Sequence, residues 1–364
     1  MASTEHKKKR HGGLIVLALF VLVSIAAGLF VYSKYTGYRD FNEAYDPADT
    51  ELREFHVERG EGYNTIAKHL QDAGLIEDAE IFSNKTKILK IGPKYQAGDF
   101  LLSPSMTMEE IMTSLQDGKR NTVRFTIPEG YTLAQTAQKL ASEGLVDEQA
   151  FYKALEDYDQ SKYWFLEDLK ADQPDPTNAA SAEANKYEGF LFPNTYEIYE
   201  GSTEKMIIDK LFAQFDKVFD EDLKKLMQER GQNVKEIVTI ASIIEREARE
   251  DEERALVASV IYNRLDIDML LQIDATIQYA QGYIKEGLLY SDLEIESPYN
   301  SYKYKGLPPG PICSPGEASI RAALEPADTD YLYYVLKSKS STTHNFAETY
   351  SQFEKYKAQF KNSK

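Results

Sequence analysis

The stretch TIASIIERE, Thr239–Glu247, is an apolar run that ends in charged residues. It lies within Val234–Glu253, whose apolar residues spread around most of a helix circumference, which predicts a largely buried helix. Two carboxylates, Glu245 and Glu247, stand at its end. A carboxyl group held against apolar surface keeps its proton to higher pH, because desolvation disfavours the charged form. Such a group can serve as a general acid.

Helical periodicity does not choose between Glu245 and Glu247, because the two residues lie on opposite flanks of the apolar sector. Either carboxylate also has a structural alternative, an ion pair with Arg246, Arg249 or Arg254. The charged run from Arg246 to Arg254 is expected to be mainly the solvated end of this helix.

The composition limits the class of protein. A chain of 364 residues with 42% hydrophobic content can bury more than one core, so two or three globular units are expected. The formal net charge is −17, although Lys7 to Arg10 form a basic cluster near the N-terminus. The rest of the chain is therefore even more acidic, which argues against binding to nucleic acid.

The N-terminal segment has the length and composition of a membrane anchor. From Leu14 to Tyr32, nineteen residues carry no charge, close to the roughly 20 needed to span a bilayer as a helix. The basic cluster before them predicts a cytoplasmic N-terminus and a single pass through the cell membrane, with residues 33–364 outside. The alternative is a signal peptide cleaved near Ser24–Ala26, but the apolar run continues past that point.

The cysteine and histidine usage argues against disulfides and metals. Cys313 is the only cysteine, so no intrachain disulfide and no cysteine-based zinc site can form. The sequence also lacks HExxH, the usual signature of a zinc hydrolase. We therefore expect no metal and no cofactor.

An internal repeat organises the region after a polar stalk at residues 33–50. GEGYNTIAKHLQDAGLIEDAEIF, Gly60–Phe82, matches GYTLAQTAQKLASEGLVDEQAF, Gly130–Phe151, with an offset of 70. Each copy follows a short alternating stretch and predicts a strand, a turn, an amphipathic helix and a second helix. The first copy continues into an expected strand over residues 98–102 and a helix from Thr107 to Leu115.

These patterns predict an α+β protein. The strand-helix-helix-strand order of residues 51–120 resembles a LysM module, a fold that binds N-acetylglucosamine-containing glycans; the alternative is a spacer without ligand. Residues 121–185 are interpreted as a second repeat-like subdomain with a linker rich in proline and small residues. Residues 186–364 remain as the domain that carries the chemistry.

Several motifs follow one another in that last domain. They are YEGFLFPNTY (187–196), ASIIEREA (241–248), NRL (263–265), LQIDATIQY (271–279), SPYNSY (297–302) and GLPPGPI (306–312). Tyrosines offer flat faces for sugar rings, and Asn, Gln and Asp offer donors and acceptors for hydroxyl groups. Taken singly, each motif is better explained as structural.

Taken together and in this order after an N-terminal anchor, the motifs resemble the MltG/YceG family of endolytic murein transglycosylases. The resemblance covers nearly the whole chain. It implies that Glu245 is the catalytic acid/base, and thereby chooses between the two carboxylates that the helix pattern leaves open. Candidate substrate-binding residues are Glu188, Gln272, Asp274, Tyr299 and Asn300.

The implied reaction is lytic transglycosylation, a carbon–oxygen lyase activity. One carboxyl group protonates the oxygen between N-acetylmuramic acid and N-acetylglucosamine in nascent strands near the membrane. It then takes the proton of the muramic acid 6-hydroxyl, which closes onto C1 and leaves a 1,6-anhydro end. The expected partners are peptidoglycan strands, and peptidoglycan synthases or the division and elongation machinery are further candidates. The alternatives are a muramidase that uses water and a non-catalytic, membrane-anchored glycan-binding scaffold of wall synthesis.

Overall fold

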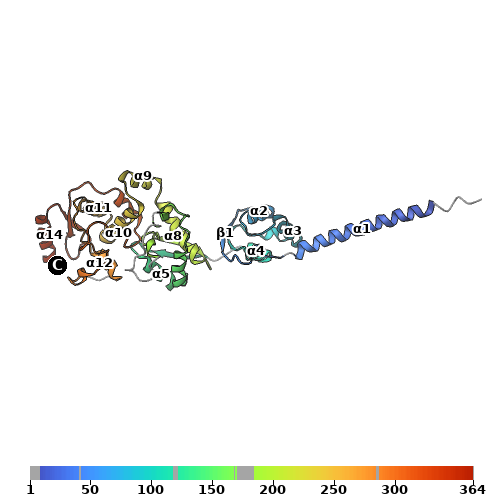
Figure 1. Cartoon of the computed structure of the whole chain (residues 1–364), viewed down its shortest axis with the longest axis horizontal. Helices are drawn as coiled ribbons and strands as arrows, with labels where there is room; N and C mark the ends of the chain where they lie inside the picture. The colour runs from blue at the N-terminus through green and yellow to red at the C-terminus, as the bar shows by residue number, and fades with distance from the viewer. Residues whose placement is uncertain are drawn as a thin grey trace, which may run out of the picture. The chain divides into compact units, whose positions relative to one another are not determined.

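The chain forms two compact units, residues 1–121 and residues 122–364, in a computed structural model (Figure 1). The structure describes residues 9–40, 42–117, 122–167, 169, 184–283 and 287–363. Both units combine helices with short antiparallel strand pairs, and helices predominate. The α+β class expected from the sequence is therefore confirmed.

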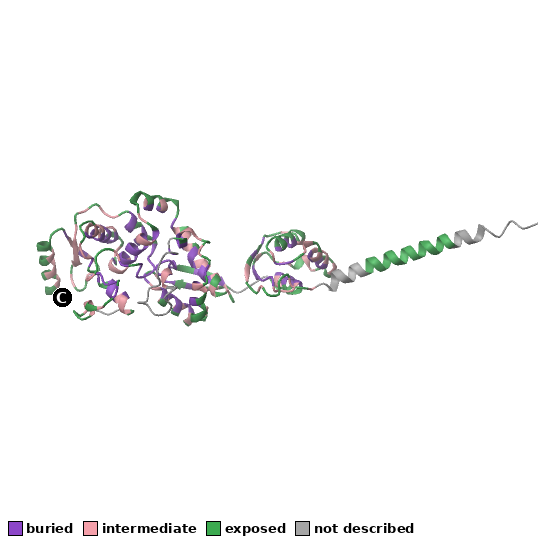
Figure 2. Cartoon of the chain, viewed as in Figure 1, coloured by how far each residue is buried: buried purple, intermediate pink, exposed green. Residues whose placement is uncertain are grey.

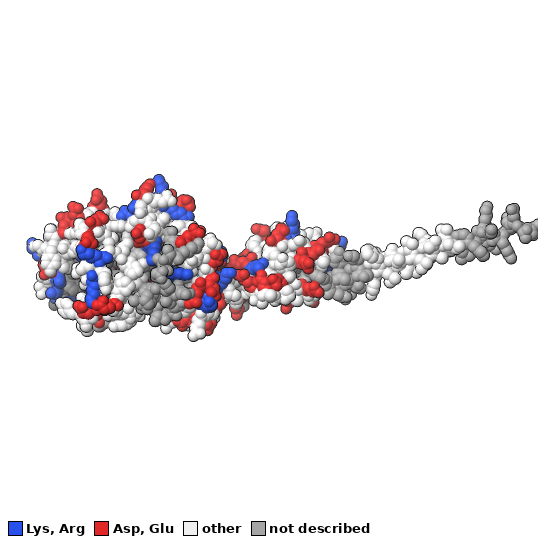
Figure 3. Space-filling model, in the orientation of Figure 1, with Lys and Arg blue, Asp and Glu red and all other residues white. Residues whose placement is uncertain are grey.

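The first unit opens with one long helix, α1 (Lys9–Asp40). Within it, Ile15–Tyr32 is long and apolar enough to cross a membrane. All of these side chains are exposed (Figure 2), and their surface is free of charged groups (Figure 3). An anchor and a signal sequence share this length and composition, so the fold alone supports both.

The rest of the first unit is a small module with its own core. Strand β1 pairs antiparallel with β2, and Phe55 of β1 lies opposite Phe100 of β2. The predicted strand over residues 98–102 and the predicted helix after Thr107 are confirmed. The elements are β1 (Arg53–Val57), α2 (Tyr63–Asp72), α3 (Ala79–Leu89), a 3₁₀ turn (Gly92–Lys94), β2 (Gly98–Leu102) and α4 (Met108–Asp117).

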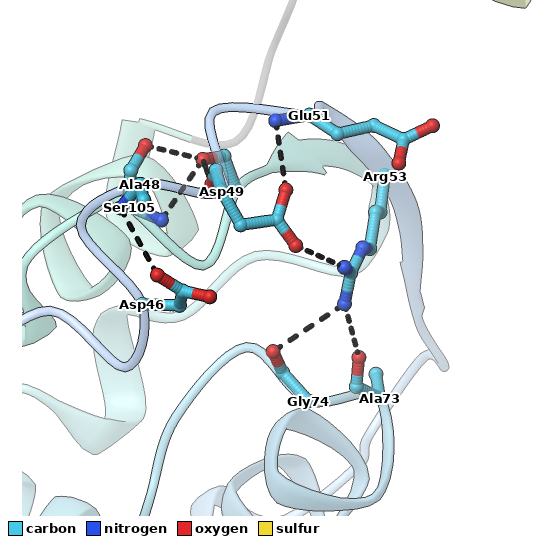
Figure 4. A network of polar contacts seen from close by, with 9 residues as sticks. Asp46, Ala48, Asp49, Glu51, Arg53, Ala73, Gly74 and Ser105 are labelled. Carbon is cyan, nitrogen blue, oxygen red and sulfur yellow. Dashed lines mark hydrogen bonds and ion pairs between the residues drawn. The ribbon is translucent and has the colours of Figure 1, made fainter.

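A polar network joins the segment before β1 to the end of α2 (Figure 4). The Arg53 guanidinium pairs with the Asp49 carboxylate at 2.5 Å. The same guanidinium donates to the carbonyl oxygens of Ala73 and Gly74, at 3.2 and 3.4 Å. One arginine thus fastens the segment before β1 to the turn that ends α2.

The second unit contains the remaining elements around one large apolar core. Figure 2 shows buried residues concentrated in its centre. The elements are β3 (Thr122–Ile127), α5 (Leu133–Ser142), α6 (Glu148–Glu156), α7 (Trp164–Glu167), a 3₁₀ helix (Ala184–Tyr187), β4 (Asn194–Tyr199), α8 (Glu204–Val218), α9 (Glu221–Arg230), α10 (Val234–Glu247), α11 (Asp251–Asp266), α12 (Asp274–Gln281), a 3₁₀ helix (Asp292–Glu294), α13 (Glu317–Leu324), β5 (Tyr333–Leu336), β6 (His344–Ala347) and α14 (Tyr350–Asn362).

The second copy of the repeat belongs to this core rather than to a subdomain of its own. Strand β3 pairs along its length with β4, and the ring of Phe125 stacks on Tyr196 at 5.4 Å. Residues of α5 and α6 join the same apolar cluster as α8 and α10. The sequence patterns suggested a boundary between residues 121–185 and residues 186–364, whereas this pairing unites the described parts of the two ranges.

Helix α10 is the buried centre of the second unit, but it is shorter than the sequence predicts. It begins with a reciprocal capping box between Asn233 and Glu236 and ends at Glu247, because Ala248 adopts an extended conformation. Helix α11 then starts at Asp251 with three acidic residues in its first turn, where the helix dipole favours negative charge. The prediction of one helix to residue 253 is therefore wrong.

Two of the sequence motifs pack against α10. Gly189 of the YEGF motif has a φ of +87°, and a Cβ there would lie 2.5 Å from Pro311 Cβ and 2.9 Å from Val238 Cγ1. Only glycine allows such a conformation at so close an approach. The motif around residue 189 and the proline-rich loop thus meet on one face of α10.

Candidate active site

Glu247 lies in the wall of a large cavity at the end of α10. The cavity has a volume of about 850 Å³ and is formed by the ends of α10 and α12 together with β5, β6 and α14. This volume is within the roughly 300–1,000 Å³ typical of ligand sites. Its lining includes Gln272, Asp274, Gln278, Tyr302, Tyr333, Tyr334, His344 and the cationic residues Arg246, Arg249, Arg264 and Lys357.

The environment of Glu247 favours its protonated form. Burial raises the pKa of this carboxyl group to about 7. The nearby charge of Asp274 raises this pKa further. A hydrogen bond from the Tyr334 hydroxyl at 2.9 Å, the charge of Arg246 and the backbone N–H of Ala275 each lower it. A carboxyl group with a pKa near neutrality can both give and take a proton at physiological pH.

Glu245, two residues earlier, lies in a different environment. Its Oε2 accepts hydrogen bonds from the Gly316 backbone N–H at 3.0 Å and from Ser319 Oγ at 2.8 Å. Arg254 Nη1 lies 3.4 Å from the same oxygen, and the Glu245 side chain is only 8% exposed. These contacts anchor the end of α10 to α11 and α13, and Glu245 does not line the cavity that holds Glu247.

The charged run after α10 is also more buried than the sequence analysis expects. Arg254 donates to Ser319 Oγ at 2.6 Å in addition to its contact with Glu245. Glu253 accepts from the His344 backbone N–H at 2.8 Å and contacts its Nδ1 at 2.7 Å. Both Glu253 and Arg254 are buried. The interpretation of this run as a solvated helix end is therefore wrong for its last two residues.

Two of the five candidate substrate-binding residues line the cavity. Gln272 lies in its wall with a φ of +51°, and its backbone N–H donates to the Ser301 carbonyl at 3.0 Å. Asp274 is the first residue of α12 and accepts a hydrogen bond from the Tyr302 hydroxyl. The cavity thus places a second carboxylate near Glu247, held by a tyrosine.

The other three candidates lie in the protein interior. Glu188 accepts hydrogen bonds from the backbone N–H of Leu133 at 2.9 Å and from the Tyr279 hydroxyl at 3.3 Å, and burial raises its pKa to about 8. Asn300 donates to two backbone carbonyls of its own loop at 2.9 Å, and Tyr299 packs against Tyr279. None of the three lines the cavity that holds Glu247, so these contacts favour structural roles.

The sequence patterns did not predict which residues contact the carboxyl groups of Glu247 and Glu245. Tyr334 approaches Glu247 from a strand 87 residues away, and Ser319 approaches Glu245 from a helix 74 residues away. The three acidic residues that open α11 were the one available signal that α10 ends before them.

The sequence matches the YceG-like family over residues 55–359. The chain belongs to this family. This YceG-like chain is 34% identical to a protein of Bacillus subtilis named endolytic murein transglycosylase, over 93% of this chain and 92% of the relative. It is 32% identical to a protein of the same name from Streptococcus pneumoniae, over 88% of this chain and 60% of that longer relative.

A crystal structure of a yceG-like protein from Listeria monocytogenes is also similar. The two share 32% sequence identity, and the match covers 84% of this chain and 98% of the other, with a TM-score of 0.55. The family resemblance inferred from the motifs is therefore confirmed.

Proposed function

We propose that this protein is an endolytic murein transglycosylase that cuts between N-acetylmuramic acid and N-acetylglucosamine and leaves 1,6-anhydro ends. The names of the Bacillus and Streptococcus relatives support the reaction class. The observation that carries the proposal is Glu247, a carboxyl group with a pKa raised to about 7 in the wall of a cavity of about 850 Å³.

Glu247, rather than Glu245, is the proton donor in this proposal. The protonated Glu247 carboxyl group donates to the glycosidic oxygen as the bond to C1 breaks. The resulting carboxylate then accepts the proton of the muramic acid 6-hydroxyl as that oxygen bonds to C1, so the residue ends protonated as it began. Glu245 instead holds the helix end in place through Gly316, Ser319 and Arg254. The resemblance alone implied Glu245, and the geometry favours its neighbour.

The reaction is tested by incubating the protein with purified glycan strands and measuring the masses of the products by mass spectrometry. Products that end in 1,6-anhydro-N-acetylmuramic acid, lighter by one water than a hydrolysed end, are expected. Hydrolysed ends would identify a muramidase that uses water. Strands that bind but stay intact would identify a non-catalytic scaffold.

The apolar helix gives the proposed enzyme a location. Ile15–Tyr32 can hold the globular units at the outer face of the cell membrane, which would restrict cleavage to nascent strands near the bilayer. We expect the full-length protein in the membrane fraction. Recovery of a soluble form that starts near Ala27 would favour a cleaved signal sequence.

The module of residues 42–117 is a candidate second glycan contact. Its strand-helix-helix-strand order supports the LysM-like interpretation, and its separate core indicates that it can be studied in isolation. We expect weak binding of chitin oligosaccharides to this segment. No detectable binding at millimolar ligand, where even an interaction of about 4 kcal/mol registers, would leave a spacer role.

A further inference from the structure

The small module of the first unit carries a patch of positive charge in an otherwise acidic segment. Residues 42–117 contain fifteen Asp and Glu residues against seven Lys and Arg residues. Four of those seven stand within ten positions, and no acidic residue occurs between Glu80 and Asp99. The four lie on α3 and on the turn that follows it: Lys85, Lys87, Lys90 and Lys94.

One of the four lysines serves the interior of the module. Lys85 is only 3% exposed, and its Nζ lies 3.5 Å from Asn42 Oδ1. The other three side chains are exposed. No ion pair involves Lys87, Lys90 or Lys94 in the part of the chain that the structure describes. We call these three exposed lysines the lysine face.

The helix α3 explains only part of this arrangement. Lys87 and Lys90 stand at its C-terminal end, where the helix dipole favours positive charge. Lys94 lies beyond the helix, in the 3₁₀ turn that follows. The segment after this turn returns to α3, because the Tyr95 hydroxyl lies 2.8 Å from Thr86 Oγ1. The helix dipole does not account for Lys94, so the lysine face needs a further explanation.

The lysine face lies on the helix that adjoins the apolar helix α1. Figure 1 shows α3 beside the C-terminal end of α1, and the two helices are in contact. Asn42, two residues after that end, accepts a hydrogen bond from the Glu109 backbone N–H at 2.8 Å. The chain is thus fastened to α3 and α4 as soon as it leaves α1.

The length of α1 limits the distance between the module and a bilayer that α1 crosses. The apolar span ends at Tyr32 and α1 ends at Asp40, so eight residues of helix follow the span. At 1.5 Å per residue these eight residues cover about 12 Å. The headgroup layer takes up roughly 5–8 Å of that distance. The remaining gap is shorter than the Debye length of about 8 Å at physiological ionic strength, so charges on the module still act on the headgroups.

The same segment also exposes apolar surface between its lysines. Leu89 is 42% exposed, and Pro93 is exposed as well. Lysines combined with exposed apolar side chains are typical of surfaces that meet the boundary between headgroups and acyl chains. The chemistry of the segment therefore matches a lipid surface of negative charge.

We propose that the lysine face binds the headgroups of anionic phospholipids in the outer leaflet and holds the module against the bilayer. The acidic remainder of the module is repelled by the same headgroups, so the contact fixes one orientation of the module. This inference rests on the proposed membrane location of the protein. It does not depend on the reaction or on which carboxyl group transfers the proton.

The test measures how fast each lysine of the full-length protein is acetylated by a reagent that cannot cross membranes. The protein is placed in vesicles of phosphatidylglycerol and phosphatidylcholine, and in vesicles of phosphatidylcholine alone, and mass spectrometry gives the rate at each lysine. In the anionic vesicles the rates at the lysine face should fall roughly fivefold, the factor by which one basic residue near an anionic surface changes its occupancy. Lys68, exposed on α2 of the same module, is the internal control whose rate should not change. In about 1 M salt, where the Debye length is about 3 Å, the difference should disappear.

Two double variants with the same net charge locate the contact. Lys87→Gln with Lys90→Gln removes two charges from the lysine face. Arg59→Gln with Lys68→Gln removes two charges from exposed positions elsewhere on the module. Lys94 should lose its protection in the first variant and keep it in the second. Equal loss in both variants would mean that net charge governs the contact, and it would overturn the proposal.

Other results would also overturn the lysine face as a lipid contact. Equal rates at its lysines in the two kinds of vesicle would do so, as would equal protection of Lys68. A protein that does not float with either kind of vesicle would show that α1 is no anchor, and the proposal would fail with it. None of these outcomes affects the release of anhydro ends from purified glycan strands, so failure of this inference and failure of the proposed reaction are told apart.

Discussion

The two glutamates at the end of α10, Glu245 and Glu247, lie in different surroundings. On one side Glu247 faces a cavity and a tyrosine hydroxyl, and burial raises its pKa to about 7. On the other side Glu245 accepts two hydrogen bonds and lies beside the Arg254 guanidinium. They are only two positions apart along the helix, with Arg246 between them.

The contrast follows from how carboxyl groups respond to their surroundings. A carboxylate that meets a cation and several donors is held in place by these contacts and becomes a structural anchor. A carboxyl group that loses water without gaining a cation in contact keeps its proton. The second condition suits a proton donor, provided that substrate can reach the group.

The largest expected effect separates these two residues. Glu247→Gln keeps the shape of the side chain but cannot pass a proton, so cleavage should fall by about 10²–10⁴-fold or more. Glu245→Gln keeps the acceptor oxygen but loses the ionic contact with Arg254, which should cost about 1–3 kcal/mol of stability. Its rate of cleavage should fall less than tenfold. Release of anhydro ends and the midpoint of thermal unfolding measure the two effects.

The reverse outcome would break the comparison. If Glu245→Gln is inactive while Glu247→Gln still releases anhydro ends, the resemblance was the better guide and the cavity is not the site of proton transfer. If both variants cleave normally, the proton donor is another residue, and Asp274 becomes the next to replace.

The sequence predicted the buried helix but not which of its two carboxylates faces a cavity. Helical periodicity shows only where a residue lies around the axis of one helix. Glu245 and Glu247 lie at similar angles from the centre of the apolar face, so this pattern does not distinguish them. Their difference arises from Tyr334 and Ser319, which the fold brings from 87 and 74 residues away. Contacts at such separations depend on the tertiary fold, and no local pattern encodes them.

The elements of the fold also differ in whether local sequence patterns or distant contacts determine them. The repeat predicted α2 and α5 in equivalent places, Tyr63–Asp72 and Leu133–Ser142, because turn residues and apolar spacing are local signals. The pairing of β3 with β4 was not predicted, because alternation identifies a strand without identifying its partner. The sequence patterns consequently suggested a division between residues 185 and 186, within the unit that the structure forms from residues 122–364.

A smaller effect concerns the pH dependence of cleavage. The general acid must be protonated in the free enzyme, so kcat/KM should fall as pH rises through about 7, the pKa of Glu247. Tyr334→Phe removes a hydrogen bond that lowers this pKa, so the alkaline limb should move to higher pH. Asp274→Asn removes a charge that raises it, so the limb should move to lower pH.

Opposite shifts are the critical feature of this experiment, because general damage to the site would lower the rate without moving the limb in opposite directions. The profile of kcat/KM against pH for the two variants and the unmodified enzyme supplies the measurement. Shifts of the same sign would mean that the limb reports a group other than Glu247.

The smallest effect on cleavage is expected at Glu188. Its pKa of about 8 is higher than that of Glu247, but Glu188 does not line the cavity that holds Glu247. Because its folded pKa is raised above the unfolded value, the native state holds this proton more tightly than the unfolded state. The protein should therefore lose stability as pH rises from about 4.5 to about 8. Glu188→Gln has no proton to lose, so its unfolding midpoint should fall less than that of the unmodified protein between pH 5.5 and pH 8.5.

The cleavage rate of Glu188→Gln at pH 6 should stay within about tenfold of that of the unmodified protein, since Gln can still accept from the backbone N–H of Leu133. A loss as large as that of Glu247→Gln, in a variant that remains folded, would mean that a raised pKa without an adjoining cavity can serve the reaction, and the contrast between the two sides of α10 would lose its meaning.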